Sequence, residues 1–375
     1  MAGQKVFCFV GETKVIIAIL ELIEKATQIL SFQKKTLFLH SISAIMRINT
    51  IIIRRLDSFI KKNIIKEQYP LLTSFSLKQR KRDGAIGVVY MLHHITKKNP
   101  NGIPTNEDLK VSPDFLEMMI LKYQKHGFDF LSLDQLYAIS SSGIKPKCPF
   151  VAFTIDDGYL DNYTEALPIF EKYEVPFAVF VATDFIDKKA ILWWDSIEDL
   201  LLTHGKVVTG DGCCYPSSTY QERWDSFRYL RERILNLNQN RLEEELNILF
   251  SNYNIDWLEP IRQQGMSWEQ VKVLAKHPLC TIGGHTVSHP SLSILPTELA
   301  KCEIQEGIEK LEQSISQPVH YFAFPYGTPN EVGEREFQIV SDLGVKLAFM
   351  AHQGCITIDN VAEMTHLPRV YFRES

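Results

Sequence analysis

From residue 85 onward, apolar residues gather in short runs that alternate with longer segments in which apolar positions recur three or four residues apart. Short, nearly continuous runs are typical of buried strands, and the longer pattern is typical of amphipathic helices. This alternation predicts a mostly parallel sheet whose strands are connected by helices. Seven strands are expected, at residues 85–92, 128–133, 148–155, 175–183, 280–286, 319–326 and 345–351.

Two segments depart from this alternation. Residues 184–265 contain long, charged helical patterns and few strand-like runs, which predicts a largely helical insertion. Residues 1–82 precede the first strand, and their longest apolar segment, 14–30, is interrupted by two glutamates and a lysine. It therefore indicates an amphipathic helix and not a membrane span. The expected organisation is a helical N-terminal extension followed by one domain, 85–375, with a motif-bearing core from about 148 to 375.

The N-terminal extension carries a concentrated positive charge. Between Lys34 and Lys66 there are eight basic residues and one acidic residue, a local net charge of +7 in a chain whose total is −5. Apolar residues between Ile52 and Ile60 fall at helical spacing beside these charges. Two interpretations are open: a solvated helix packed on the main domain, or a helix that lies on an anionic membrane surface.

Composition limits the class of protein. The total charge is small and no segment combines spaced basic and aromatic residues, so no nucleic-acid partner is expected. The seven cysteines are odd in number and contain no CxxC pair, which argues against a disulfide framework. The apolar run at residues 6–10 is too short for an export signal. We therefore expect a cytoplasmic protein, with peripheral contact at the inner membrane face as one alternative.

Polar residues of types that serve in catalysis or metal binding follow three of the predicted strands. Asp156 and Asp157 end the strand at 148–155, His285 and His289 lie four residues apart after a later strand, and a Pro-Tyr-Gly run follows another. Each signal is weak alone, because Asp-Asp-Gly is common in turns and an HxxxH pair arises by chance. At one mouth of a barrel, however, two imidazoles and one carboxylate can bind a cation, and the second carboxylate is free to accept a proton.

The same residues are similar to those of a known family. "TIDDG" (154–158), "HTVSHP" (285–290) and "FPYG" (324–327) occur in the order and spacing of the motifs of the polysaccharide deacetylases, the NodB-like domains of carbohydrate esterase family 4. The chain from about Val88 to its C-terminus resembles this family, including members that act in surface polysaccharide biosynthesis. The resemblance implies a distorted seven-stranded (β/α) barrel that uses one divalent metal ion, for which zinc is the expected identity.

The resemblance also implies roles for individual residues. Asp156 would be the catalytic base, and the metal ligands would be Asp157, His285 and His289. The substrate-binding residues would be Pro325 and Tyr326, with a backbone N–H near Tyr326 stabilising the oxyanion.

The chain departs from the family pattern in two places, and one role stays open. Ile155 replaces an aromatic residue of the first motif, and the arginine that often precedes the Pro-Tyr pair is missing. Arg369, in the "LPRV" run near the C-terminus, resembles a terminal element of biosynthetic members and can supply the missing guanidinium; the alternative is a surface ion pair. The general acid is open between His366, by its order in the chain, and His93, at the end of the first strand.

The expected function is metal-dependent hydrolysis of an N-acetyl group from an amino sugar in a glycan or glycan precursor. Two alternatives remain: an amidohydrolase-like activity on a cyclic amide such as a purine catabolite, and a catalytically silent glycan-binding domain. Tryptophans in and beside the insertion can stack on sugars, but we expect them to form its core instead. They are Trp193, Trp194, Trp224, Trp257 and Trp268.

Overall fold

The structure, a computed structural model, describes residues 84–374. The predicted helical extension at 1–82, its basic segment and its proposed membrane contact lie outside the described residues. None of the helices within 84–374 is both long enough and apolar enough to cross a membrane.

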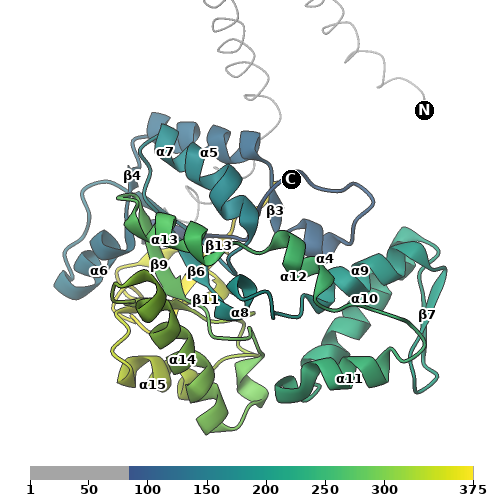
Figure 1. Ribbon diagram of the computed structural model, residues 1–375. Helices are drawn as coiled ribbons and strands as arrows, with labels where there is room; N and C mark the ends of the chain where they lie inside the picture. The colour runs from purple at the N-terminus through teal and green to yellow at the C-terminus, as the bar shows by residue number, and fades with distance from the viewer. Residues whose placement is uncertain (1–83, 375) are drawn as a thin grey trace, which may run out of the picture. The chain divides into compact units, whose positions relative to one another are not determined.

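A closed ring of seven parallel strands forms the centre of the domain (Figure 1). Residues Gly87–Leu92 of the first strand pair with Phe150–Ile155 of the next, and the other edge of the first strand pairs with the last strand, which closes the ring. This confirms the predicted seven-stranded barrel. Its strands are β1 (Ala85–Leu92), β5 (Phe150–Ile155), β6 (Phe177–Val181), β9 (Cys280–Gly284), β10 (Tyr321–Ala323), β11 (Leu347–Gln353) and β13 (Leu367–Tyr371).

One member of the ring differs from the prediction. The run at 128–133 forms only a short strand, β4 (Asp129–Phe130), which pairs with the beginning of β5 outside the ring. The seventh barrel strand is instead β13, which contains a proline and an arginine and was not expected to be a strand. β4 does not enter the ring because both edges of β5 are occupied there: β1 pairs with one edge along its whole length, and β6 pairs with Phe153–Ile155 on the other. A further short strand, β12 (Ile356–Thr357), pairs antiparallel with the start of β1.

Helices surround the ring, and their caps follow from the sequence. In α5 (Pro113–Lys125), the Ser112 hydroxyl accepts a hydrogen bond from the backbone N–H of Phe115, and Pro113 occupies the first turn, where its missing N–H costs nothing. The other helices on the barrel are α6 (Leu133–Ser142), α7 (Leu167–Lys172), α13 (Trp268–Lys276), α14 (Thr297–Ile315) and α15 (Glu334–Asp342).

Residues 184–265 hold a second apolar core, built mainly by helices that lie beside the barrel in Figure 1. Trp193, Phe227, Phe250 and Trp257 are each at most 3% exposed in this core. The elements between β6 and α13 are α8 (Thr183–Ile186), α9 (Trp193–Thr203), β7 (Lys206–Val208), β8 (Cys214–Pro216), α10 (Tyr220–Leu235), α11 (Leu242–Leu249) and α12 (Glu259–Gln264).

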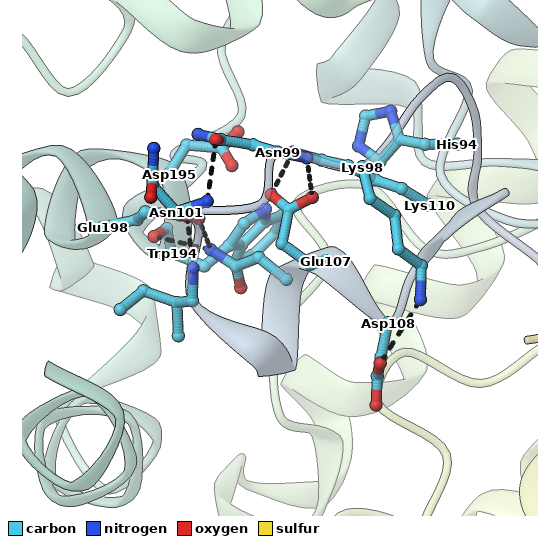
Figure 2. A network of polar contacts seen from close by, with 12 residues as sticks. His94, Lys98, Asn99, Asn101, Glu107, Asp108, Lys110, Trp194, Asp195 and Glu198 are labelled. Carbon is cyan, nitrogen blue, oxygen red and sulfur yellow. Dashed lines mark hydrogen bonds and ion pairs between the residues drawn. The ribbon is translucent and has the colours of Figure 1, made fainter. Parts of the chain in front are cut away.

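A polar network connects these helices to the segment that follows β1 (Figure 2). This segment contains β2 (His94–Ile95), α4 (Pro104–Glu107) and β3 (Lys110–Val111). The buried carboxylate of Glu198, on α9, accepts hydrogen bonds from the backbone N–H of Ile103 at 2.7 Å and from the side chain of Asn106 at 2.5 Å. Because a buried carboxylate is costly unless it is hydrogen-bonded, these contacts fix α9 against the start of the domain.

Candidate active site

The C-terminal ends of the barrel strands open into a cavity of about 290 Å³. Asp156 and Asp157 directly follow β5, and His285 directly follows β9. Parallel strands carry their C-terminal ends to the same face of a barrel, so residues far apart in the sequence meet at this cavity. Its lining includes both aspartates, His285, His289, His93, Tyr326 and Arg369.

Asp157, His285 and His289 form a cluster of metal-ligating groups. Oδ1 of Asp157 lies 3.2 Å from Nε2 of His285 and 3.3 Å from Nε2 of His289. The three ligand atoms all lie within 4.8 Å of one another. Oδ1 of Asp157 is buried and has no hydrogen-bond partner, although two ring nitrogens are directed at it. A cation between the three groups would satisfy this oxygen, so the residues fit a metal ion.

The loop that carries the two histidines is held by α14. The carboxylate of Glu303 accepts hydrogen bonds from the backbone N–H groups of Val287 and Ser288 at 3.0 and 2.9 Å. Gly307, one turn further along α14, packs so closely that a Cβ there would lie 2.7 Å from the carbonyl carbon of Thr286. Nδ1 of His285 also contacts the backbone carbonyl of Ala323 at 2.7 Å, which orients its Nε2 toward Asp157.

Asp156 has a different partner from its neighbour. The Arg369 guanidinium donates two hydrogen bonds to it, one to each carboxylate oxygen and both of 2.7 Å, and Arg369 is fully buried. The same guanidinium donates to the Thr154 hydroxyl and to the carbonyl of Met350. Burial is the largest single effect and opposes ionisation of Asp156, but the charge and hydrogen bonds of Arg369, together with His285 and His93, outweigh it and hold the pKa of that carboxyl below its usual value. Asp156 is thus an ionised carboxylate next to the metal cluster.

The two candidate general acids lie in different places. His93 follows β1 and lines the cavity, where burial lowers its pKa although Asp157 and Asp156 oppose this shift. His366 precedes β13, at the opposite end of that strand from the mouth. It pairs with Glu363 at 3.2 Å and stacks on Phe337. The structure therefore does not bring His366 to the cavity, because parallel strands present only their C-terminal ends there.

Of the two predicted substrate-binding residues, only Tyr326 lines the cavity, whereas Pro325 is buried beneath it. The Tyr326 ring lies 4.7 Å from that of His289, and its hydroxyl accepts a hydrogen bond of 3.3 Å from Trp193. Both Tyr326 and Gly327 have a positive φ, and a Cβ at Gly327 would lie 2.6 Å from the backbone nitrogen of Ala351. The glycine therefore permits the tight turn that presents Tyr326.

Several cavity residues were not predicted as site residues. Arg231, from α10, and Arg373, after β13, both line the wall. The sequence around each of these arginines contains no motif, so only the three-dimensional structure identifies them as cavity residues. Of the tryptophans, Trp257 belongs to the second core as expected, whereas Trp193, Trp194 and Trp224 also line the cavity. Trp268 instead donates a hydrogen bond to Asp187.

Comparisons with known proteins agree with this geometry. A family model described as polysaccharide deacetylase matches residues 143–348, more than half of the chain. The protein YxkH of Bacillus subtilis (strain 168) is 25% identical over 112 residues, which are 30% of this chain and 37% of YxkH, so the match spans well under half of that relative.

Among solved structures, the Streptococcus pyogenes deacetylase PplD in complex with acetate is similar to this chain with a TM-score of 0.51. It is 18% identical, and the match covers 76% of this chain and 92% of PplD. IcaB from Ammonifex degensii is 19% identical over 77% of this chain and 92% of its own, with a TM-score of 0.49. The likeness to PplD supports the barrel fold.

Proposed function

Because this chain belongs to the polysaccharide deacetylase family, a family of hydrolases that act on carbon–nitrogen bonds in carbohydrates, we propose that it removes the N-acetyl group from an amino sugar in a glycan or glycan precursor. The observation that carries the proposal is the pairing of two unlike carboxylates at one mouth. Asp157 faces two imidazoles, whereas Asp156 is held ionised by Arg369.

The residues suit amide hydrolysis. A divalent cation held by Asp157, His285 and His289, which we propose to be zinc, would act as a Lewis acid and ease the ionisation of water. Asp156 accepts a proton from the attacking water as the new carbon–oxygen bond forms. A backbone N–H near Tyr326 donates to the oxygen that becomes negative.

His93 donates a proton to the amide nitrogen as the carbon–nitrogen bond breaks, which releases acetic acid and the free amine; the acid then gives its proton to the amine or to water and leaves as acetate. Burial lowers the pKa of its imidazole, so the protonated ring is a stronger acid than an ordinary imidazolium, although it is less populated near neutral pH. The proton that Asp156 took from water then restores the charge on His93, so that the cycle leaves the enzyme unchanged.

The test is acetate release from a panel of N-acetylated oligosaccharides and lipid-linked sugars, measured before and after a chelator and again after metal is restored. We expect turnover that the chelator abolishes and that zinc restores. In Asp156→Asn, bound metal should be unchanged while kcat falls by about 100-fold or more, the scale of general-base catalysis. In His285→Ala or His289→Ala, metal content and activity should fall together.

Three outcomes would contradict the proposal. Sugar binding without acetate release would indicate a glycan-binding domain, and hydrolysis of a cyclic amide without acetate would indicate the other alternative. Normal turnover in Asp156→Asn would exclude this residue as the base.

A further inference from the structure

The charges that line the catalytic cavity are not all accounted for by the proposed reaction. Asp156 and Arg369 neutralise each other, and Asp157 belongs to the metal cluster. Three charged residues remain in the wall: Asp108, Arg231 and Arg373. They have no role in the chemistry described above.

Arg231 has no carboxylate partner among residues 84–374. Two other arginines of α10 do: Arg228 lies 3.6 Å from Asp225, and Arg233 lies 2.5 Å from Asp211. The Arg231 guanidinium instead lies over the ring of Tyr326, with its central carbon 5.8 Å from the ring centre. A half-buried guanidinium beside an aromatic ring keeps its five N–H donors largely free.

Arg373 shares its carboxylate with a lysine. Nη1 of Arg373 lies 3.7 Å from Oδ2 of Asp108, and Nζ of Lys98 lies 3.6 Å from Oδ1 of the same residue (Figure 2 shows the Lys98 contact). One negative charge thus faces two positive charges, and neither contact is a short hydrogen bond. This group therefore has an excess of one positive charge, in addition to that of Arg231.

Both arginines line the same cavity. The central carbon of the Arg373 guanidinium lies 4.9 Å from the centre of the Tyr371 ring, which also lines the cavity. Burial raises the pKa of the Tyr371 hydroxyl, while the charges of Arg369, Arg373 and Arg231 oppose that rise. Because Arg369 is committed to Asp156, the guanidinium donors that remain in the cavity wall are those of Arg231 and Arg373.

We propose that Arg231 and Arg373 form an anion subsite beside Tyr371, which binds an oxyanion carried by the substrate, a phosphate ester or a uronate carboxylate. Guanidinium groups bind both kinds of oxyanion through paired hydrogen bonds. The subsite rests on the proposed deacetylation, since it lies in the same cavity as Asp156. It selects an acidic amino-sugar derivative over a neutral one.

The first test compares three probes in acetate-release kinetics with the metal-loaded, full-length protein. The probes are the methyl glycoside of N-acetylglucosamine, N-acetylglucosamine 1-phosphate, and a disaccharide of N-acetylglucosamine and glucuronic acid. We expect at least one acidic probe to exceed the neutral one in kcat/KM by about 10-fold or more at low ionic strength. The acidic probe that gains identifies the source of the oxyanion. The preference should decline as salt is added.

Variants then assign the preference to these residues. In Arg231→Gln and Arg373→Gln, the ratio of acidic to neutral kcat/KM should fall by about 10- to 100-fold, and Arg231→Lys should retain part of it. Arg228→Gln is the matched control, because Arg228 lies on the same helix, is exposed and does not line this cavity. In Arg228→Gln, the ratio of acidic to neutral kcat/KM should equal that of the wild type. Attraction of phosphate to the metal is common to all variants and cancels in this comparison.

Binding of products keeps the two proposals separable, because products do not turn over. Glucosamine 1-phosphate should bind the wild type about 10-fold or more tightly than methyl glucosaminide, and Arg231→Gln should abolish that difference. If no probe released acetate but glucosamine 1-phosphate still bound more tightly than methyl glucosaminide, the proposed deacetylation would be wrong and the subsite correct. Equal kcat/KM for acidic and neutral probes in the wild type, or equal losses for both in Arg231→Gln, would overturn the subsite.

Discussion

At the scale of single residues, the site depends on how one buried charge is compensated. Arg369 lies 213 positions after Asp156 and is supplied by the strand that closes the barrel. Removal of two ions from water is costly, and only two short hydrogen bonds and the further contacts of the guanidinium offset that cost. This ion pair is therefore a requirement for an ionised Asp156, and not a surface contact.

Replacement of Arg369 tests this requirement. In Arg369→Gln, Asp156 loses its compensating charge, so its pKa should rise, because only the weaker effects of His285 and His93 then oppose burial. The acidic limb of the pH profile of kcat/KM should move to higher pH, since a lower proton concentration then suffices to protonate the base. Unfolding in urea should show a loss of about 3–5 kcal/mol, typical of a broken buried pair. Arg228→Gln serves as the exposed control; an unchanged acidic limb in Arg369→Gln would contradict the assignment.

The two histidines predicted as general acids provide a matched pair of variants. His93→Ala should lower kcat by about 100-fold or more, because it removes the proton donor from the cavity. His366→Ala should leave kcat within about twofold of the wild type, because His366 lies at the far end of β13 and is paired with Glu363. Acetate-release kinetics check both. A large loss in His366→Ala with full activity in His93→Ala would reverse the assignment.

At the scale of elements, α14 acts as the support of the metal cluster. It contributes no ligand, yet Glu303 fixes two backbone N–H groups between the histidines and Gly307 packs against the backbone of Thr286. Thr286 and His289 both have positive φ values. Such backbone conformations are costly and persist only where surrounding contacts impose them.

Loosening this support should weaken the metal site without removal of a ligand. A methyl group in Gly307→Ala would lie 2.7 Å from backbone atoms and force α14 away from the histidine loop. Glu303→Gln would weaken the two backbone hydrogen bonds. Each variant should reduce metal affinity by about 10- to 100-fold, as measured by competition with a chromophoric chelator. Gly333→Ala is the control, because nothing lies within 4 Å of its added Cβ. Metal affinity in Gly307→Ala equal to that of the control would contradict this role.

The sequence predicted elements and site residues to different extents, for physical reasons. Asp157 follows a strongly apolar run, whereas the run before His285 and His289 contains two glycines, so their convergence was expected from the order and spacing of three motifs together with the parallel topology. β13 was missed because Pro368 and Arg369 interrupt its apolar pattern. The strand predicted at 128–133 is shorter than expected, because an apolar run does not reveal whether the strands beside it have an unpaired edge to offer. Arg231 was missed because helical periodicity does not indicate which polar residues face a cavity formed with another element.

At the scale of the whole molecule, the barrel and the helical core at 184–265 contribute different properties to one cavity. The barrel strands supply the residues proposed for the chemistry, whereas the second core supplies Trp193, Trp194 and Arg231. Specificity can therefore change through residues 184–265 while the chemistry is retained. The general arrangement is that of a rigid barrel with variable connecting segments.

The basic N-terminal segment leads to the last prediction, which rests on the sequence alone. We propose that the +7 charge between Lys34 and Lys66 holds the protein at the cytoplasmic membrane face, where lipid-linked glycan precursors are accessible. Each basic residue near an anionic surface contributes about 1 kcal/mol, and salt screens this attraction. The full-length chain should therefore float with anionic liposomes at low salt and dissociate at high salt. A full-length variant with the eight basic residues replaced by glutamine should not float. If the wild type also stayed with the soluble fraction at low salt, the segment would instead be a helix packed on the main domain.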